Sequence, residues 1–178
     1  MWYFVADEHY NHAKILDYCG RPFADVTEMN EAMIANHNAV VASQDITIHA
    51  GDFGWFKTAE EASTIIRRLH GSHIFLKGSH DRWLPNSAPF MWRKMIDGQF
   101  VVVCHYAMRT WERAHHGSFN VHGHSHGMLP PLGKQLDVGV DCHGFAPVSF
   151  ETIKHLMKTR PMLHGVSHDQ PLEMDVYG

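Results

Sequence analysis

The chain has 178 residues, of which 44% are hydrophobic and 19% charged, as expected for a single globular domain with a buried core. A formal net charge of −4 excludes a strongly basic surface, so we expect no stable complex with nucleic acid. We also expect no membrane span and no signal peptide, because apolar runs are short and the first residues lack a basic region. Three cysteines without CxxC spacing predict reduced thiols and a cytoplasmic protein.

Hydrophobic periodicity predicts alternating strands and helices in the first part of the chain. Thr58 and Gly71 have the residue types of a helix start and a helix end, and Asn11 is a candidate cap for a short first helix. Such alternation favours a parallel sheet with helices packed on it. The expected strands span residues 2–6, 45–52 and 73–78, and the expected helices 11–18, 26–41 and 58–71.

The second part has fewer helices, which predicts a second sheet with antiparallel pairing. Its expected strands span residues 99–106, 119–126 and 135–141, followed by a helix at 149–159 that begins through Ser149. We therefore predict one domain over residues 1–159 and a C-terminal tail over 160–178. His164 and His168, two of the 17 histidines of the chain, are expected to be solvated in that tail.

Polar side chains recur where the predicted strands end. The carboxyl ends of strands in an open α/β sheet are where loops converge and ligands bind. In an extended segment, residues i and i+2 point the same way, so Asp7 with His9, and His124 with His126, form natural ligand pairs. Mixed carboxylate and imidazole ligands suit Mn, Fe, Zn or Co. The groups at strand ends are Asp7-Glu8-His9, Gly51-Asp52, Gly78-Ser79-His80-Asp81, Cys104-His105-Tyr106 and Gly123-His124-Ser125-His126.

Each of these motifs has an ordinary structural explanation when it stands alone. A DxH pair is a weak signal, and a GD pair at a strand end is common turn chemistry. All five in order, each at a predicted strand end, favour one metal site. Asp52, on the central strand, is the candidate to bridge two ions.

The order DxH, GD, GxHD, H and GHxH resembles the calcineurin-like metallophosphoesterase superfamily. The segments "ADEHYNHAKILDYCGRPF" (6–23) and "LDVGVDCHGFAPVSFETI" (136–153) further resemble its short single-domain members from bacteria and bacteriophages, and the resemblance covers residues 3–155. It implies an α/β fold, a four-layer α/β/β/α sandwich of two mixed sheets flanked by helices, with a dinuclear metal site at one edge.

The resemblance also implies a role for each motif residue. His80 would face the substrate, and Asp81 would orient its imidazole. His12 would either contact substrate or be a surface histidine at a helix start. The implied first-metal ligands are Asp7, His9 and His126, the second-metal ligands are His105 and His124, and Asp52 bridges the two ions.

Ser79 departs from the superfamily pattern, which has asparagine as a second-metal ligand at this position. A serine hydroxyl is shorter and a poorer ligand than an amide oxygen. Either Ser79 leaves a working dinuclear site with a weaker second metal, or the second metal and the activity are largely lost. We expect a weakened second site and a retained first site. His37 and Asn38 are interpreted as helix-face residues rather than replacement ligands.

The resemblance implies a metal-dependent hydrolase, a phosphodiesterase or phosphatase acting on nucleotides or other small phosphoesters through a metal-activated water. It implies two divalent ions, Mn²⁺ first, with Fe, Zn, Ni, Co or Mg as alternatives. Substrate-facing segments are expected at 53–57, 81–92 and 108–116. Phosphate contacts are expected from Arg82, Arg109 or Arg113, and base stacking or local packing from Trp55, Trp83, Trp92 and Trp111.

The alternative is a catalytically impaired metal-binding interaction protein, because Ser79 replaces the expected ligand. A zinc-stabilised structural module is disfavoured, since structural zinc sites favour cysteine ligands and the three cysteines lie outside the motifs. The oligomeric state stays open.

Overall fold

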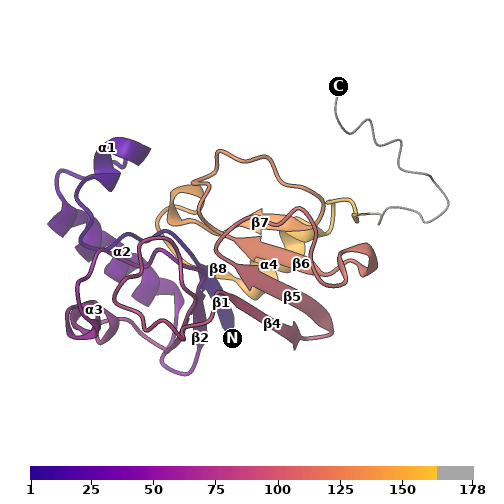
Figure 1. Cartoon of the computed structure of the whole chain (residues 1–178), viewed down its shortest axis with the longest axis horizontal. Coiled ribbons are helices and arrows are strands. Elements are labelled where there is room, and N and C mark those ends of the chain that lie inside the picture. The colour runs from indigo at the N-terminus through magenta and orange to yellow at the C-terminus, as the bar shows by residue number, and fades with distance from the viewer. Residues whose placement is uncertain (164–178) are drawn as a thin grey trace.

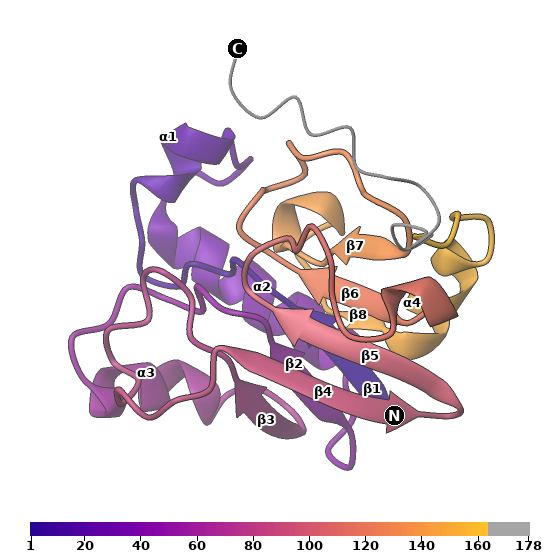
Figure 2. The same cartoon turned by 45° about the vertical axis from the view of Figure 1, so that its right-hand side comes forward.

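Two four-stranded sheets stack on each other in the computed structural model (Figures 1 and 2). The structure describes residues 1–163. Most of the predicted tail, including His164 and His168, lies outside the described residues. Within them, no helix is both long and apolar enough to cross a membrane.

The first sheet has the strand order β3-β2-β1-β8. Its strands β1 (Trp2–Val5), β2 (Ile46–His49) and β3 (Ser72–Phe75) are parallel, and β8 (Val148–Ser149) pairs antiparallel with β1. The helices of this half are α1 (Ile15–Cys19), α2 (Val26–Val40) and α3 (Ala59–Ile66). Helices α2 and α3 cover the outer face of the sheet (Figure 1), as the strand and helix alternation predicted.

The second sheet has the order β4-β5-β6-β7. Its strands are β4 (Met91–Ile96), β5 (Gln99–Cys104), β6 (Phe119–His122) and β7 (Gln135–Asp137). The prediction of antiparallel pairing was wrong for most of it: β5, β6 and β7 are parallel, and β4 alone runs antiparallel.

Strand β4 was missed because it is an edge strand with mostly exposed side chains and no clear alternation. The available signal was Asp97-Gly98. Both residues have positive φ and join Ile96 to Gln99 as a two-residue hairpin turn, for which Asp-Gly is a preferred sequence.

Alternate residues of the strands fill three separate apolar layers, one between the sheets and one on the outer face of each sheet. Phe4 and Ile48 from the first sheet meet Val101 and Val121 from the second between the sheets, where α4 (Phe150–Met157) also buries its apolar side. The outer face of the second sheet is covered by a loop that contains the single-turn 3₁₀ helix η1 (Ala114–His116), so the fourth layer is thin. The expected class, two mixed sheets with flanking helices, is confirmed.

Helix ends follow local chemistry in some places and tertiary contacts in others. The hydroxyls of Thr58 and Ser149 cap α3 and α4 as predicted. Asn11 is not a cap: its side chain is hydrogen-bonded to that of Asn30, and α1 begins only at residue 15. Gly71 does not end α3, which stops at residue 66; its φ of +94° instead turns the chain into β3.

Candidate metal centre

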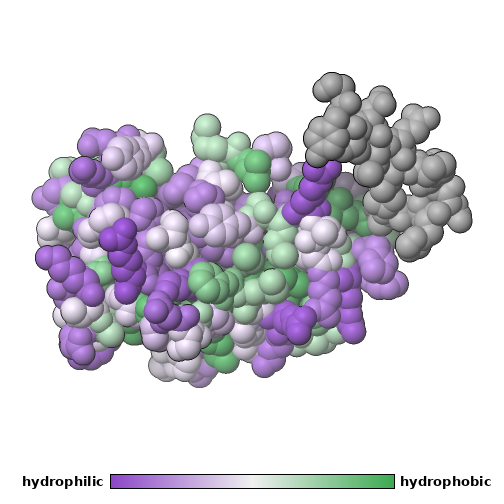
Figure 3. Space-filling model, viewed as in Figure 1, coloured by the Kyte–Doolittle hydropathy of each residue, from purple (hydrophilic) through white to green (hydrophobic). Residues whose placement is uncertain are grey.

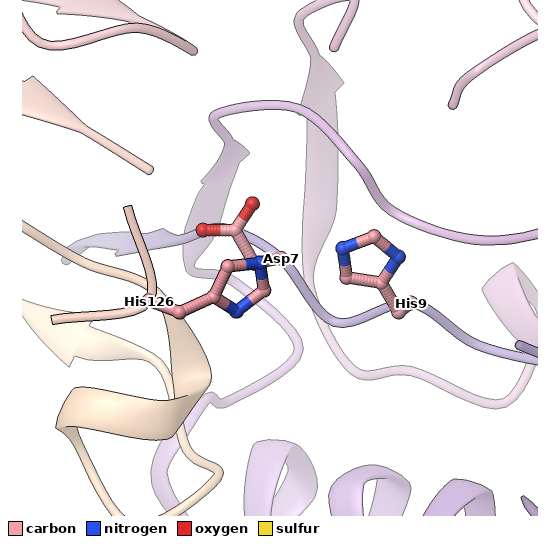
Figure 4. Close-up of side chains that lie close together, drawn as sticks. All are labelled: Asp7, His9 and His126. Carbon is pink, nitrogen blue, oxygen red and sulfur yellow. The ribbon is translucent and has the colours of Figure 1, made fainter. Parts of the chain in front are cut away.

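The predicted ligands meet where β1, β2, β5 and β6 end, so loops from both sheets contribute to one site. They form two groups, and within each group the candidate ligand atoms lie within 4.8 Å of one another. Figure 4 shows one of them, with side chains drawn from the loops after β1 and β6. The groups are Asp7, His9 and His126, and Asp52, His105 and His124.

Three buried side-chain atoms at this site have no hydrogen-bond partner: Asp7 Oδ1, His9 Nε2 and His105 Nε2. Leaving buried polar atoms unpaired is costly, so native structures rarely do so without a ligand. Burial also raises the pKa of Asp7 to about 7, although nearby His105 and His126 act the other way. This donor set, a carboxylate oxygen and imidazole nitrogens, fits a divalent transition-metal ion.

Asp52 lies between the two groups. Its Oδ2 is 3.3 Å from His105 Nε2 and 3.9 Å from His9 Nε2, while its Oδ1 accepts a hydrogen bond from the His80 backbone N–H at 2.8 Å. Burial alone would raise the pKa of Asp52, but His105 and this N–H outweigh it and hold the pKa well below its usual range. The carboxylate is therefore ionised and lies between the two groups of candidate ligands.

The backbone at these ligands is left-handed rather than extended. Among the described non-glycine residues, nine have positive φ, and five of these are candidate ligands: Asp7, His9, Asp52, His124 and His126. The expectation that each DxH or HxH pair lies on an extended strand was therefore wrong, since the pairs follow the ends of β1 and β6. His124 and His126 consequently belong to different groups. Such strained conformations concentrate at functional sites.

Glycines at the strand ends leave room for the ligand side chains. A Cβ at Gly123 would lie 2.7 Å from Asp7 Oδ2, and one at Gly51 would lie 2.6 Å from His105 Nδ1. Both distances are below any normal contact, so only glycine lets the two sheets approach closely at this edge.

Hydrogen bonds fix which nitrogen of each imidazole faces the site. His105 Nδ1 donates to the Ala50 carbonyl at 3.0 Å, and His126 Nδ1 donates to Asp141 at 2.7 Å. In both rings Nε2 is therefore the nitrogen with a free lone pair, as a metal ligand requires. His9 Nδ1 lies 3.1 Å from His12 Nδ1, so His12 contacts the nitrogen of this imidazole that is not the unpartnered Nε2.

No protein-family model matches the chain. The uncharacterised protein MJ1445 of Methanocaldococcus jannaschii is 30% identical over 164 residues, covering 88% of this chain and 90% of that protein. The solved structure of AQ665 from Aquifex aeolicus, a protein of unknown function, matches with a TM-score of 0.67 and 21% identity over 88% of this chain and 98% of that one. A Streptococcus pneumoniae protein described as a predicted phosphoesterase matches with a TM-score of 0.43 and 12% identity over 78% and 70% of the two chains. The chain therefore belongs to one family with MJ1445, and it has the fold of AQ665.

The site contains a buried arginine that the sequence analysis missed. Arg21 is buried and forms two hydrogen bonds with Asp141, both at 2.8 Å. It also donates to the backbone carbonyls of Asp7 and Glu8. Burial alone would raise the pKa of Asp141, but the bonds from His126 and Arg21 lower it to about 2. Arg21 thus holds the ligand loop after β1 and the orienting partner of His126 in one unit.

Ser79 contacts the carboxylate of Asp52 directly. Its hydroxyl donates a hydrogen bond to Asp52 Oδ2 at 2.9 Å. The residue that replaces the expected asparagine therefore binds the oxygen that faces His9, His80 and His105.

Asp81 does not orient the imidazole of His80, contrary to the expectation. It is buried and accepts hydrogen bonds from the backbone N–H groups of Gly78, Asp52 and Phe53 and from the indole of Trp83. Its position one residue after His80 suggested a side-chain contact, but the turn points it inward, where it joins the loops after β2 and β3.

His80 lies at the mouth of the site. Its ring packs among those of His9, His12 and Trp55, with centroid separations of 5.3, 5.7 and 5.3 Å. Its Nε2 is 3.9 Å from Asp52 Oδ2, and 38% of the side chain is exposed. His80 can therefore reach a ligand held against the bridging position.

A cavity opens over the site, and its lining includes His9, Asp52 and His80. Several predicted substrate-contact residues lie away from this cavity. Arg82 and Arg109 do not line it, and the Arg113 guanidinium sits over the Phe100 ring at 4.8 Å. Of the four tryptophans considered, Trp55 lines the cavity. Trp111 is buried in the outer layer, and Trp83 and Trp92 pack on other aromatic rings.

Proposed function

We propose that this chain is a metal-dependent hydrolase of small phosphoesters, acting as a phosphodiesterase or phosphatase. The observation that supports it best is the set of three buried, unpartnered ligand atoms close to Asp52, which together with His9 lines an open cavity. A carboxylate between two groups of imidazoles suits two divalent ions, and Mn²⁺ is our first choice.

Some of the site residues would bind the metal ions, and His80 would take part in the reaction. Asp7, His9 and His126 would hold one ion and His105 and His124 the other, with Asp52 between them. Two ions there would neutralise phosphoryl oxygens and acidify a water. His80 reaches over this position from the cavity side, where its imidazole can donate a proton to the departing oxygen.

The test is hydrolysis of bis-p-nitrophenyl phosphate and p-nitrophenyl phosphate after chelation and addition of Mn²⁺. We expect Mn²⁺-dependent turnover that Asp52→Asn abolishes. Loss of a general acid costs about 10²–10⁴-fold, so His80→Ala should lower kcat by that order while Mn²⁺ still binds. His115→Ala, an exposed histidine outside the cavity, is the matched control. Turnover that persists without metal, or in Asp52→Asn, would refute the proposal.

A second candidate function rests on the bond between Ser79 and Asp52. If it keeps the second ion away, the chain would bind one metal with little turnover and act as an interaction protein. The outcome specific to this candidate is Mn²⁺ binding without hydrolysis in the unmodified chain, with hydrolysis gained in Ser79→Asn.

A further inference from the structure

The cavity over the candidate metal centre is larger than metal ions alone would need. Its volume is about 850 Å³, within the range of sites that enclose whole small molecules. The metal-centre side chains form its base. Its outer walls come from the segment around α1, from Trp55 and from Met128 in the loop after β6.

Trp55 presents an aromatic surface beside His80. Its ring stacks on His12 at 4.6 Å and lies 5.3 Å from His80, yet 48% of the residue is exposed. The backbone N–H of Trp55 donates to the Tyr10 carbonyl at 2.7 Å, which fixes this loop against the one after β1. The indole is therefore positioned by its neighbours and remains open toward the cavity.

Two further exposed side chains line the same cavity. Tyr18 on α1 is 71% exposed and Met128 is 87% exposed. Figure 3 shows hydrophobic side chains on the loop that rises between β6 and β7, with a depression between this loop and α1. Large side chains left open around one cavity mark a ligand surface more often than isolated exposed residues do.

The charges of the outer cavity restrict what it can accept. Lys14 is the one lysine or arginine among the described lining residues. One cation suits a single ester better than a polyphosphate chain or a nucleic-acid strand, which need several phosphate contacts.

We propose that Trp55, Tyr18 and Met128 form a subsite for a flat, uncharged aromatic group carried by the phosphoester, of which a nucleobase is the natural example. This assignment rests on the proposed function and deepens it, because it names a nucleoside monoester or cyclic diester as the substrate class. Aromatic faces bind bases by stacking, and a thioether adapts to the opposite face.

The test compares binding of two phosphates that differ only in the base. The Mn²⁺-loaded protein is titrated with adenosine 5′-monophosphate and with ribose 5-phosphate by calorimetry. We expect the nucleotide to bind at least tenfold more tightly. Trp55→Ala should remove most of that difference and leave ribose 5-phosphate binding unchanged. Tyr18→Ala should reduce it in part, while Phe90→Ala, exposed but outside the cavity, should not.

The outcomes separate this inference from the proposed function. Equal affinities for the two phosphates, or an unchanged ratio in Trp55→Ala, would overturn the subsite even if bis-p-nitrophenyl phosphate is hydrolysed. Absence of nucleotide binding would overturn it too. Failure of Mn²⁺-dependent hydrolysis, with base-dependent binding intact, would instead count against the hydrolase. Mn²⁺ titration of each variant confirms that the metal centre remains formed.

Discussion

Replacing Ser79 with asparagine should strengthen binding of a second metal ion. The Ser79 hydroxyl donates to Asp52 Oδ2, and that bond must break or be shared when this oxygen turns to a cation. Hydrogen bonds to charged groups contribute about 1.5–3 kcal/mol. Ser79 is exposed, so we take the lower end, about 1.5 kcal/mol, which corresponds to a second site weakened by slightly more than about tenfold.

The second metal site could be weak for two reasons: the Ser79 hydroxyl competes for the Asp52 carboxylate, or the site lacks one ligand. Two substitutions distinguish these reasons. Ser79→Ala removes the hydrogen bond without adding a ligand, so the second dissociation constant should fall by up to about tenfold. Ser79→Asn also adds an amide oxygen and should lower it further. The first dissociation constant should change less than the second in either variant, because Asp7, His9 and His126 do not contact Ser79 and only the shared ligand Asp52 does.

Calorimetric titration of chelator-treated protein with Mn²⁺ measures both constants. Two equally tight sites in the unmodified chain would refute the reasoning, as would a second site indifferent to both substitutions. If Ser79→Ala has no effect and Ser79→Asn does, the missing ligand matters and the hydrogen bond does not.

Three further predictions test the surroundings of the site. Arg21→Ala should lower the free energy of unfolding in urea by about 3 kcal/mol, because it leaves the half-buried carboxylate of Asp141 without its cation, whereas Arg68→Ala, which removes an exposed ion pair, should change it little. Burial lowers the pKa of His37 to about 3. Below pH 6.5 this imidazole therefore takes up a proton in the unfolded chain but stays neutral in the folded chain. The unfolding free energy of metal-free protein should fall by up to about 1.4 kcal/mol per pH unit from pH 6.5 toward 4, and less steeply in His37→Gln but not in His115→Gln. Gly78→Ala would press a Cβ against the carboxylate at the bridging position and should abolish Mn²⁺ binding in a titration.

The candidate ligands could be predicted because each follows a strand whose apolar residues can be recognised in the sequence. Parallel strands carry such residues to one edge regardless of how they are ordered in the sheet. The position of His105, for example, could be predicted once the apolar strand before it was recognised. The same reasoning could not find the bond between Arg21 and Asp141, since 120 residues separate them and neither carries a local signal of the contact.

Other differences arose where tertiary geometry overrides a local rule. The left-handed backbone at Asp7 and His9 replaced the extended pairing expected from their spacing, although the ligands still converge. Asp81 is next to His80 in sequence, yet the turn directs its carboxylate to backbone N–H groups. Parallel pairing in the second sheet depends on the crossover connections between its strands, which short apolar runs do not reveal.

The ligands come from two sheets that an isolated β-bridge, between Ala6 and Gly139, joins at this edge. Asp7, His9 and Asp52 follow strands of the first sheet, and His105, His124 and His126 follow strands of the second. Bound ions would therefore act as cross-links that fasten one sheet to the other at this edge. A site filled at 100 times its dissociation constant stabilises a fold by about 2.7 kcal/mol. The supply of metal would then set how long the protein survives, and not only how fast it works.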